Sequence, residues 1–237
     1  AASAAPHVAT MLESQNLTIL DPLTAQLFPS AVVGGRLCVA VVAGRPFAVR
    51  VAGSPYSRTE AVLAVDGRDT LTNRPADPSA SGIVFNGTYL CKGFRVSESE
   101  VREFVAAQVG HGMTTAERND SAQCSGLVAA VLYGEGRVMH QSHTLGAGPV
   151  MRGGGVTRGG GVTRGEGVSR GSVGAAAGQA VESRVGSTSW TRGGEIWRAV
   201  IEYDTLQGWA ARGITIPGIS MANPWPGEQR FASTASR

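Results

Sequence analysis

Histidines are the side chains of this sequence best suited to chemistry, and two of them, His140 and His143, are closely spaced. Side chains three residues apart share one face of a helix, so this pair could bind a zinc ion. The two residues lie in a polar stretch with no adjacent glutamate and no nearby cysteine. We therefore interpret them as a surface or hydrogen-bonding pair. His111 lies between two glycines and is interpreted as a loop residue.

Serine and lysine patterns give no catalytic or cofactor-binding signal. Ser125 precedes a glycine, but the Gly-x-Ser-x-Gly turn of a nucleophilic serine is absent. Lys92 is the only lysine, so the chain lacks the Gly-x-x-x-x-Gly-Lys loop that binds phosphates. We predict that the protein is not an enzyme and has no catalytic, metal-binding or cofactor-binding residues. The alternative is a sugar-binding sandwich enzyme whose catalytic groups come from distant loops, which local spacing would not detect.

A hexapeptide repeat, Arg-Gly-Gly-Gly-Val-Thr, runs through residues 152–170. Each unit has one apolar side chain and up to three glycines, so burial cannot offset the entropy lost when it becomes ordered. Segments rich in arginine and glycine can bind RNA, but this one is short, contains Glu166 and has no aromatic residue. We favour an extended strand laid on a protein partner. The predicted partner-binding residues are Arg152, Val156, Arg158, Val162, Arg164, Val168 and Arg170.

The composition indicates a globular chain without a membrane span. The 237 residues are 42% hydrophobic, and none of the apolar runs reaches the ~18 residues of a membrane-spanning helix. A net charge of +3 is too small to predict nucleic-acid binding for the chain as a whole. Three cysteines, Cys38, Cys91 and Cys124, lie in apolar surroundings, where free buried thiols are expected.

Short valine-rich runs separated by turn-forming residues predict a mainly β fold, an antiparallel and jelly-roll-like β-sandwich. The dipeptide Asp66-Gly67 follows one run and predicts a tight turn, because both residues tolerate positive φ. We interpret Asp66 and Asp69 as turn residues rather than acid catalysts. Residues 97–105 permit either a capped helix or a strand. The predicted strands cover residues 37–42, 47–51, 61–65, 82–85, 89–94 and 124–133.

An alternating strand followed by one short helix is predicted near the C-terminus. The side chains of Trp197, Ala199, Ile201 and Tyr203 share one face, which we expect to be buried. Asp204 is the predicted helix cap, with the helix ending at residue 213 and with residues 206, 209 and 210 on one face. This strand and helix are too small to fold alone, so we expect them to dock on the preceding domain.

These patterns divide the chain into five segments. The predicted segments are an extended N-terminal arm (1–33), the β-sandwich (34–149), a Gly/Arg-rich excursion (150–187), the docking strand and helix (188–216) and an extended tail (217–237). The first segment could instead be a peripheral strand that closes the sheet of the β-sandwich itself.

Several stretches of the chain resemble an uncharacterised β-sandwich domain of bacterial proteins of unknown function. The resemblance rests on residues 46–51, Val-Asp-Gly-Arg-Asp at 65–69 and Gly-Phe-Arg-Val-Ser at 93–97, and it continues after the glycine-rich segment at residues 201–204. It implies a sandwich architecture and a strand rather than a helix over residues 97–105, and it implies no activity. The family's Gly-His-Gly segment appears here only as residues 145–148, without the histidine, so no role of that histidine carries over.

The favoured function is that of a structural subunit of a large repeating assembly, such as a minor capsid, decoration or tail protein of a virion. A cell-surface or filament protein is a close alternative. A nucleic-acid-associated accessory subunit that uses the Arg/Gly repeat is the alternative of a different class. The expected partners are other copies of the chain and other assembly subunits, with nucleic acid possible but not favoured and no membrane. A virion or the extracellular surface is the favoured location.

Overall fold

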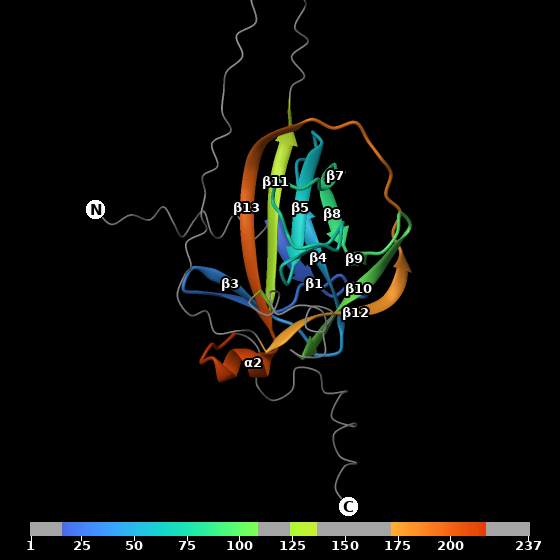
Figure 1. The fold of residues 1–237 in the computed structure, drawn as a ribbon. Coiled ribbons are helices and arrows are strands. Elements are labelled where there is room, and N and C mark those ends of the chain that lie inside the picture. Colours follow the sequence, from blue (N-terminus) through green and yellow to red (C-terminus); the bar gives the residue numbers. More distant parts are fainter. Residues whose placement is uncertain (1–15, 109–123, 137–171, 217–237) are drawn as a thin grey trace, which may run out of the picture.

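A computed structural model describes residues 16–108, 124–136 and 172–216 of the chain. These residues form a pair of β-sheets that pack face to face around one apolar core, with a single short helix at one end (Figure 1). The prediction of a mainly β, sandwich-like fold is confirmed.

The first sheet contains six strands, all paired antiparallel. Four of them follow the order β1-β4-β10-β12, so β1 and β12 lie at its edges. In addition, β8 pairs with β4, and β9 pairs with β10. The strands are β1 (Leu17–Leu20), β4 (Pro46–Ala52), β8 (Thr88–Cys91), β9 (Gly93–Arg95), β10 (Glu100–Gln108) and β12 (Val173–Glu182).

The second sheet contains seven strands, of which six follow the order β2-β3-β13-β11-β5-β6 and β7 pairs with β5. One pair, β13 with β3, is parallel, and the others are antiparallel. The strands are β2 (Ser30–Val33), β3 (Arg36–Ala40), β5 (Thr59–Val65), β6 (Arg68–Asp69), β7 (Ile83–Phe85), β11 (Leu127–Glu135) and β13 (Arg192–Asp204).

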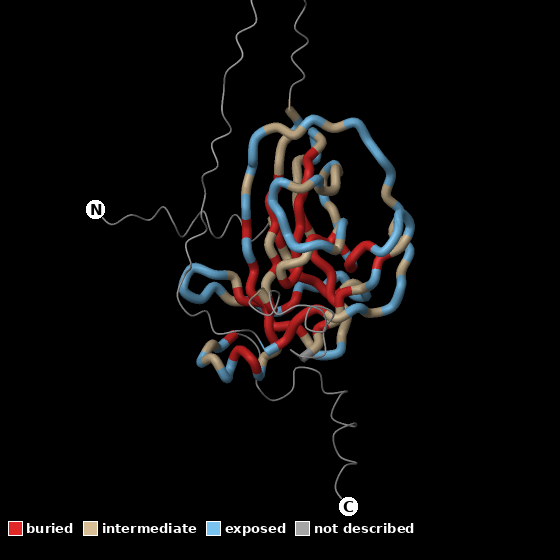
Figure 2. Tube along the Cα trace, viewed as in Figure 1, coloured by how far each residue is buried: buried red, intermediate tan, exposed pale blue. Residues whose placement is uncertain are grey.

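Alternating side chains from both sheets form the core. Figure 2 shows where the buried residues lie along the chain. In β13 the expected face is buried at Ala199, Ile201 and Tyr203, with Trp197 partly buried beside them. Aromatic rings fill the space between the sheets. The ring of Phe104 in β10 stacks on that of Phe47 at 5.3 Å, and Phe47 in turn contacts Tyr203 at 5.2 Å between ring centroids.

Helix α2 (Leu206–Ala211) covers a smaller apolar cluster on the outer face of the second sheet. Trp209 is fully buried there, and its indole nitrogen donates to the carbonyl of Val39 at 2.9 Å. The predicted helix cap is one residue off, because the side chain of Thr205 accepts from Gly208 N. The predicted apolar face is only partly right, since Ala210 is exposed.

The predicted domain division differs from the structure at two places. The predicted arm includes residues 17–33, but in this stretch β1 pairs with β4 and β2 pairs with β3. Residues 17–33 therefore belong to the sandwich, in agreement with the alternative of a peripheral strand. The predicted excursion (150–187) contains β12, which pairs with β10 along the first sheet. Gly178 lies beside the register shift of this pair, where a Cβ atom would be 2.7 Å from Val105 Cγ2, so this position has no room for a side chain.

Two predictions about the local backbone are confirmed. Asp66 and Gly67 have φ of 52° and 75° and form the turn between β5 and β6. The ambiguous residues 97–105 contribute to strand β10 rather than to a helix. The three cysteines are free thiols, with Cys38 and Cys91 buried. No helix in the described ranges is long and apolar enough to cross a membrane.

Candidate functional site

Three clusters of buried polar contacts involve strand β13. Buried polar clusters hold it at both ends, and the middle of the strand has an open edge. A further buried cluster, around Asp66, joins β13 to the first sheet.

Asp66 is a fully buried carboxylate that joins the two sheets. Its Oδ2 accepts from the backbone N–H of Ala175 in β12, at 2.5 Å. Its Oδ1 accepts from the N–H groups of Gly126 and Leu127, at the start of β11. The hydroxyl of Tyr203 in β13 lies 2.8 Å from both oxygens. One side chain therefore connects a turn of the second sheet with three strands, one of them in the first sheet.

This environment makes Asp66 a structural group rather than a free acid or base. Burial raises the pKa of Asp66 to about 6, although the hydrogen bonds from Ala175 and Tyr203 act in the opposite direction. Burial raises the pKa of the nearby Cys124 thiol, and the charge of Asp66 raises it further, so Cys124 is not set up as a thiolate nucleophile. The buried hydroxyl of Ser125 has no hydrogen-bond partner among the described residues.

We expect the free energy of unfolding to depend on pH through Asp66. The folded pKa, about 6, lies above the ordinary value of 3.8, so the folded state binds more protons between these two pH values. Asp66 therefore contributes on the order of 3 kcal/mol to the free energy of unfolding below pH ~4. This contribution decreases as the pH rises and is lost above pH ~6. Urea unfolding of the wild type and of Asp66→Asn at several pH values measures the pH-dependent contribution of Asp66. A difference between the two proteins that does not change with pH would contradict this expectation.

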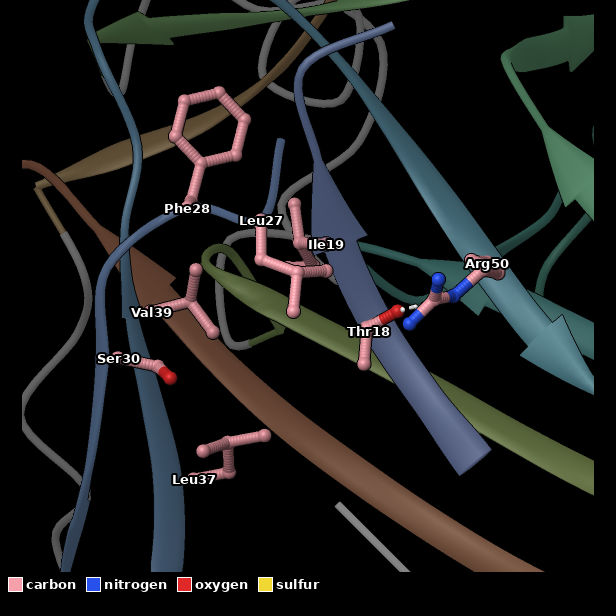
Figure 3. Close-up of a pocket in the computed structure, with 8 residues that line it drawn as sticks. All are labelled: Thr18, Ile19, Leu27, Phe28, Ser30, Leu37, Val39 and Arg50. Atoms are coloured by element: carbon pink, nitrogen blue, oxygen red, sulfur yellow. Dashed lines mark hydrogen bonds between the residues drawn. The ribbon is translucent and has the colours of Figure 1, made fainter. Parts of the chain in front are cut away.

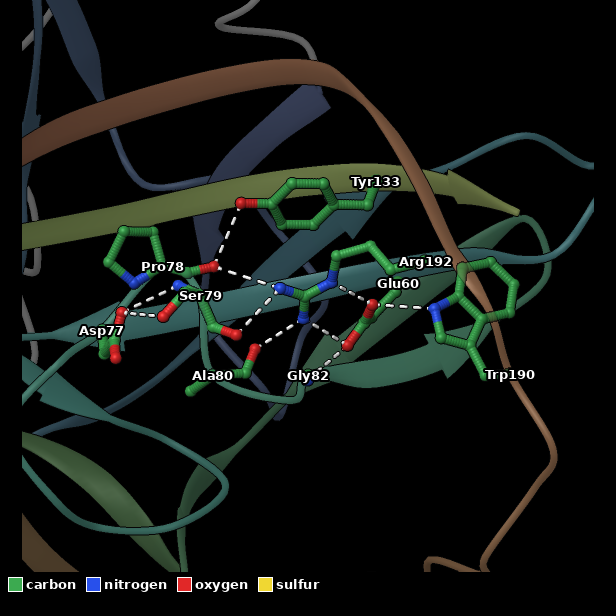
Figure 4. Close-up of polar contacts among 9 residues, drawn as sticks. All are labelled: Glu60, Asp77, Pro78, Ser79, Ala80, Gly82, Tyr133, Trp190 and Arg192. Carbon is green, nitrogen blue, oxygen red and sulfur yellow. Dashed lines mark hydrogen bonds and ion pairs between the residues drawn. The ribbon is translucent and has the colours of Figure 1, made fainter. Parts of the chain in front are cut away.

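The first end of β13 is held by a buried ion pair between Arg192 and Glu60 of β5 (Figure 4). Arg192 donates through Nε and Nη2 to the two carboxylate oxygens of Glu60, at 2.7 and 2.6 Å. The indole of Trp190 donates to one of these oxygens at 2.8 Å, and Gly82 N donates to the other at 2.6 Å. Burial acts to raise the pKa of Glu60, but these hydrogen bonds outweigh it and lower the pKa overall.

The same guanidinium also fixes the loop before β7. Arg192 donates to the carbonyl oxygens of Pro78, Ser79 and Ala80, at 3.4, 3.1 and 2.5 Å. Its Cζ lies 4.3 Å from the centre of the Tyr133 ring, and the Tyr133 hydroxyl donates to Pro78 O. Figure 4 shows the guanidinium between the loop carbonyls and Glu60, under the ring. The beginning of β13 is thus tied to β5, to β11 and to the loop.

The other end of β13 is held by Asp204, which is fully buried. Its carboxylate accepts from Ser172 N at 2.9 Å and from the Ser172 hydroxyl, just before β12. It also accepts from Thr205 N at 2.7 Å and from Arg212 Nη2 at 2.8 Å, just after α2. This carboxylate fixes the helix and the start of β12 to the end of β13.

Between these anchors one edge of β13 is open. Strand β3 pairs with β13 only at Ile201 to Asp204, as Figure 1 shows at the lower end of the strand. The stretch from residue 192 to residue 200 pairs with β11 on one side and has no strand on the other among the described residues. The outward side chains of Ile196 and Val200 are 54% and 53% exposed, with Arg198 between them in an exposed ion pair with Glu195.

The structure locates only some of the residues that the sequence singled out. The predicted partner-binding residues of the repeat (Arg152, Val156, Arg158, Val162, Arg164, Val168 and Arg170) lie outside the described residues, as do His111, His140 and His143. The described residues contain no group of three or more histidine, cysteine, aspartate or glutamate side chains that could bind a metal ion. Local spacing does not reveal Glu60, Trp190 or Arg192, because their partners are far apart in the chain. For Ile196 and Val200 a signal is present, since apolar side chains on the outward face of a predicted strand indicate an interface.

Comparison of the chain with models of known protein families, with curated proteins and with solved structures finds no match. The resemblance to an uncharacterised bacterial β-sandwich domain therefore stays a prediction. The function is inferred from the geometry of the chain itself.

Proposed function

We propose that this chain is a non-enzymatic structural subunit of a large repeating assembly, and more specifically a virion protein of the minor capsid, decoration or tail type. The observation that carries the proposal is the open edge of β13, from residue 192 to residue 200, with its exposed Ile196 and Val200. A strand edge presents unpaired N–H and C=O groups, which pair readily with a strand of another chain.

The anchoring of β13 supports an interface role for this edge. Proteins usually protect an exposed edge with a bulge, a proline or an inward-pointing charge. The register of β13 with β11 shifts at Ile196, between the pairs Trp197–Leu132 and Glu195–Tyr133, but residues 197 to 200 pair with β11 without a shift, and Val200 is exposed there. The Glu60–Arg192 pair and Asp204 hold the strand in place before any partner binds. Such preorganisation lowers the entropy cost of adding a strand.

The virion assignment rests on architecture and on the repeat. Apart from the parallel pair of β13 with β3, the two packed sheets are antiparallel, as in the jelly-roll domains that build many viral capsids. The repeat of residues 152–170 adds a segment suited to lie in extended form on a neighbouring subunit. Its arginines and valines remain the proposed contacts of that segment with other copies of the chain or with other assembly subunits.

Self-association through β13 tests this proposal. We expect the full chain to form oligomers whose size rises with concentration, and the double variant Ile196→Lys/Val200→Lys to weaken the association constant at least ~10-fold, because charges at the edge oppose strand pairing. Sedimentation velocity measures both effects. The control is Val96→Lys, which places one such charge at a 49% exposed valine outside β13.

Two outcomes would contradict the proposal. One is a wild-type protein that stays monomeric up to ~1 mM. The other is a double variant that associates as strongly as the Val96→Lys control. Equal melting temperatures of the two variants would exclude misfolding as the cause of a difference.

A further inference from the structure

A groove opens on the side of the sandwich where the edges of the two sheets meet. It has a volume of about 400 Å³ and lies along β1, the edge strand of the first sheet, facing β2 and β3 of the second (Figure 3). A volume in this range accommodates a small organic molecule. Eight residues line it: Thr18, Ile19, Leu27, Phe28, Ser30, Leu37, Val39 and Arg50.

One wall of the groove is apolar and is drawn from three elements. Ile19 projects from β1, Leu27 and Phe28 from the segment after it, and Leu37 and Val39 from β3. Figure 3 shows Phe28, Val39 and Leu37 along one side, with Ile19 and Leu27 toward the middle. Leu27 is 55% exposed, so an apolar ligand in the groove would remove a large hydrophobic side chain from water.

The opposite side of the groove is polar and carries one positive charge. Arg50 in β4 pairs in register with Thr18 in β1, and its Nε donates to the Thr18 hydroxyl at 3.1 Å. None of the ion pairs between described residues involves Arg50, so its terminal N–H groups remain for an anion. A guanidinium presents two parallel N–H groups, the geometry that a carboxylate accepts.

The free edge of β1 is partly closed to a peptide strand. Phe28 N donates to Ile19 O at 3.2 Å, and Leu20 forms a bridge with Leu27. The chain's own segment thus occupies this half of the β1 edge. What remains open is a side-chain groove rather than a slot for strand addition, which favours a small ligand over an extended peptide.

We propose that this groove binds an aliphatic carboxylate, with the carboxylate on Arg50 and the alkyl chain against Ile19, Leu27, Phe28, Leu37 and Val39. This inference does not depend on the proposed assembly role, because it uses the opening beside β1 and not the edge of β13. The polar head gives the ligand its orientation, and the apolar wall makes the affinity depend on chain length.

Titration of the full chain with hexanoate, octanoate and decanoate, below their micellar concentrations, tests the proposal by calorimetry. We expect the affinity to rise about fourfold for each added CH₂ until the groove is filled. Arg50→Gln should weaken octanoate binding at least ~10-fold, and Arg50→Lys should weaken it less, because the charge remains without the fork. Octanol lacks the negative charge. Its affinity for the wild type should therefore be no higher than the affinity of octanoate for Arg50→Gln.

Two further variants make the outcome decisive. Ser30→Trp fills the groove from an exposed position of β2 and should abolish binding, whereas Arg102→Gln removes an exposed arginine of β10 outside the groove and should leave it unchanged. Binding that survives Ser30→Trp, or that falls equally with Arg50→Gln and Arg102→Gln, would overturn the proposal. So would the absence of measurable octanoate binding to the wild type. Melting curves of each variant confirm that it is folded.

Discussion

Replacing Asp66 with alanine is expected to destabilise the protein severely, by on the order of 4 kcal/mol or more. The change leaves the N–H groups of Ala175 and Gly126 and the hydroxyl of Tyr203 buried without their acceptor. It also removes the side chain that links β12 of the first sheet to the second. We expect a fall in melting temperature of about 10 °C or more, measured by circular dichroism.

Asp77→Ala is the matched control for this prediction. Asp77 also accepts hydrogen bonds from a backbone N–H and a hydroxyl, both of Ser79, but it is exposed. Its loss should cost less than ~1 kcal/mol, because water can replace it. Tyr203→Phe, which removes one donor and leaves the carboxylate with its backbone partners, should give an intermediate loss. If Asp66→Ala were no more destabilising than Asp77→Ala, the role of Asp66 as a link between the sheets would be wrong.

Removing Arg192 is expected to have the second largest effect. Arg192→Met keeps an aliphatic side chain but leaves Glu60, which is 2% exposed, without its positive partner. Breaking a buried ion pair in this way costs about 3–5 kcal/mol, since an uncompensated charge stays in the interior. The carbonyl oxygens of Ser79 and Ala80 lose a donor as well. Urea unfolding monitored by tryptophan fluorescence measures the loss.

A second variant shows whether the buried charge is the cause. Arg192→Met combined with Glu60→Gln should recover some of the stability, because no charge then remains buried. Arg198→Met is the control on the same strand, since the pair of Arg198 with Glu195 is exposed and should contribute less than ~1 kcal/mol. A double variant that is less stable than Arg192→Met would show that the buried charge of Glu60 is not the cause of the loss. The contacts of Arg192 with the loop would then be the main source of the stability that Arg192 provides.

Both predictions concern groups whose importance is invisible in the local sequence. The interpretation of Asp66 as a turn residue is correct, because an Asp-Gly pair after a strand is a local signal. The same residue has partners 60 and 109 positions further along the chain. Nothing in the spacing around it indicates those contacts. The same holds for Glu60 and Arg192, which are 132 residues apart.

Some differences between expectation and structure also have a clear physical cause. The sequence favours a linker where strand β12 lies, because the residues there are small and carry little apolar surface. Pairing with β10 supplies the backbone hydrogen bonds that the local sequence does not predict. The stretch from residue 17 to residue 33 is equally compatible with an arm and with a peripheral strand. Only the register of Leu17 to Leu20 with β4 distinguishes the two.

The sequence by itself determined the mainly β class, most of the strands, the tight turn at Asp66 and the buried face of β13. These features depend on residue type and on a period of two along the chain, which are local properties. The tertiary structure alone decided that β3 pairs with only the last residues of β13, and therefore decided the open edge beside Ile196 and Val200. It also decided which carboxylates are buried and which groups donate hydrogen bonds to each of them, because desolvation and long-range pairing arise only when distant segments pack together.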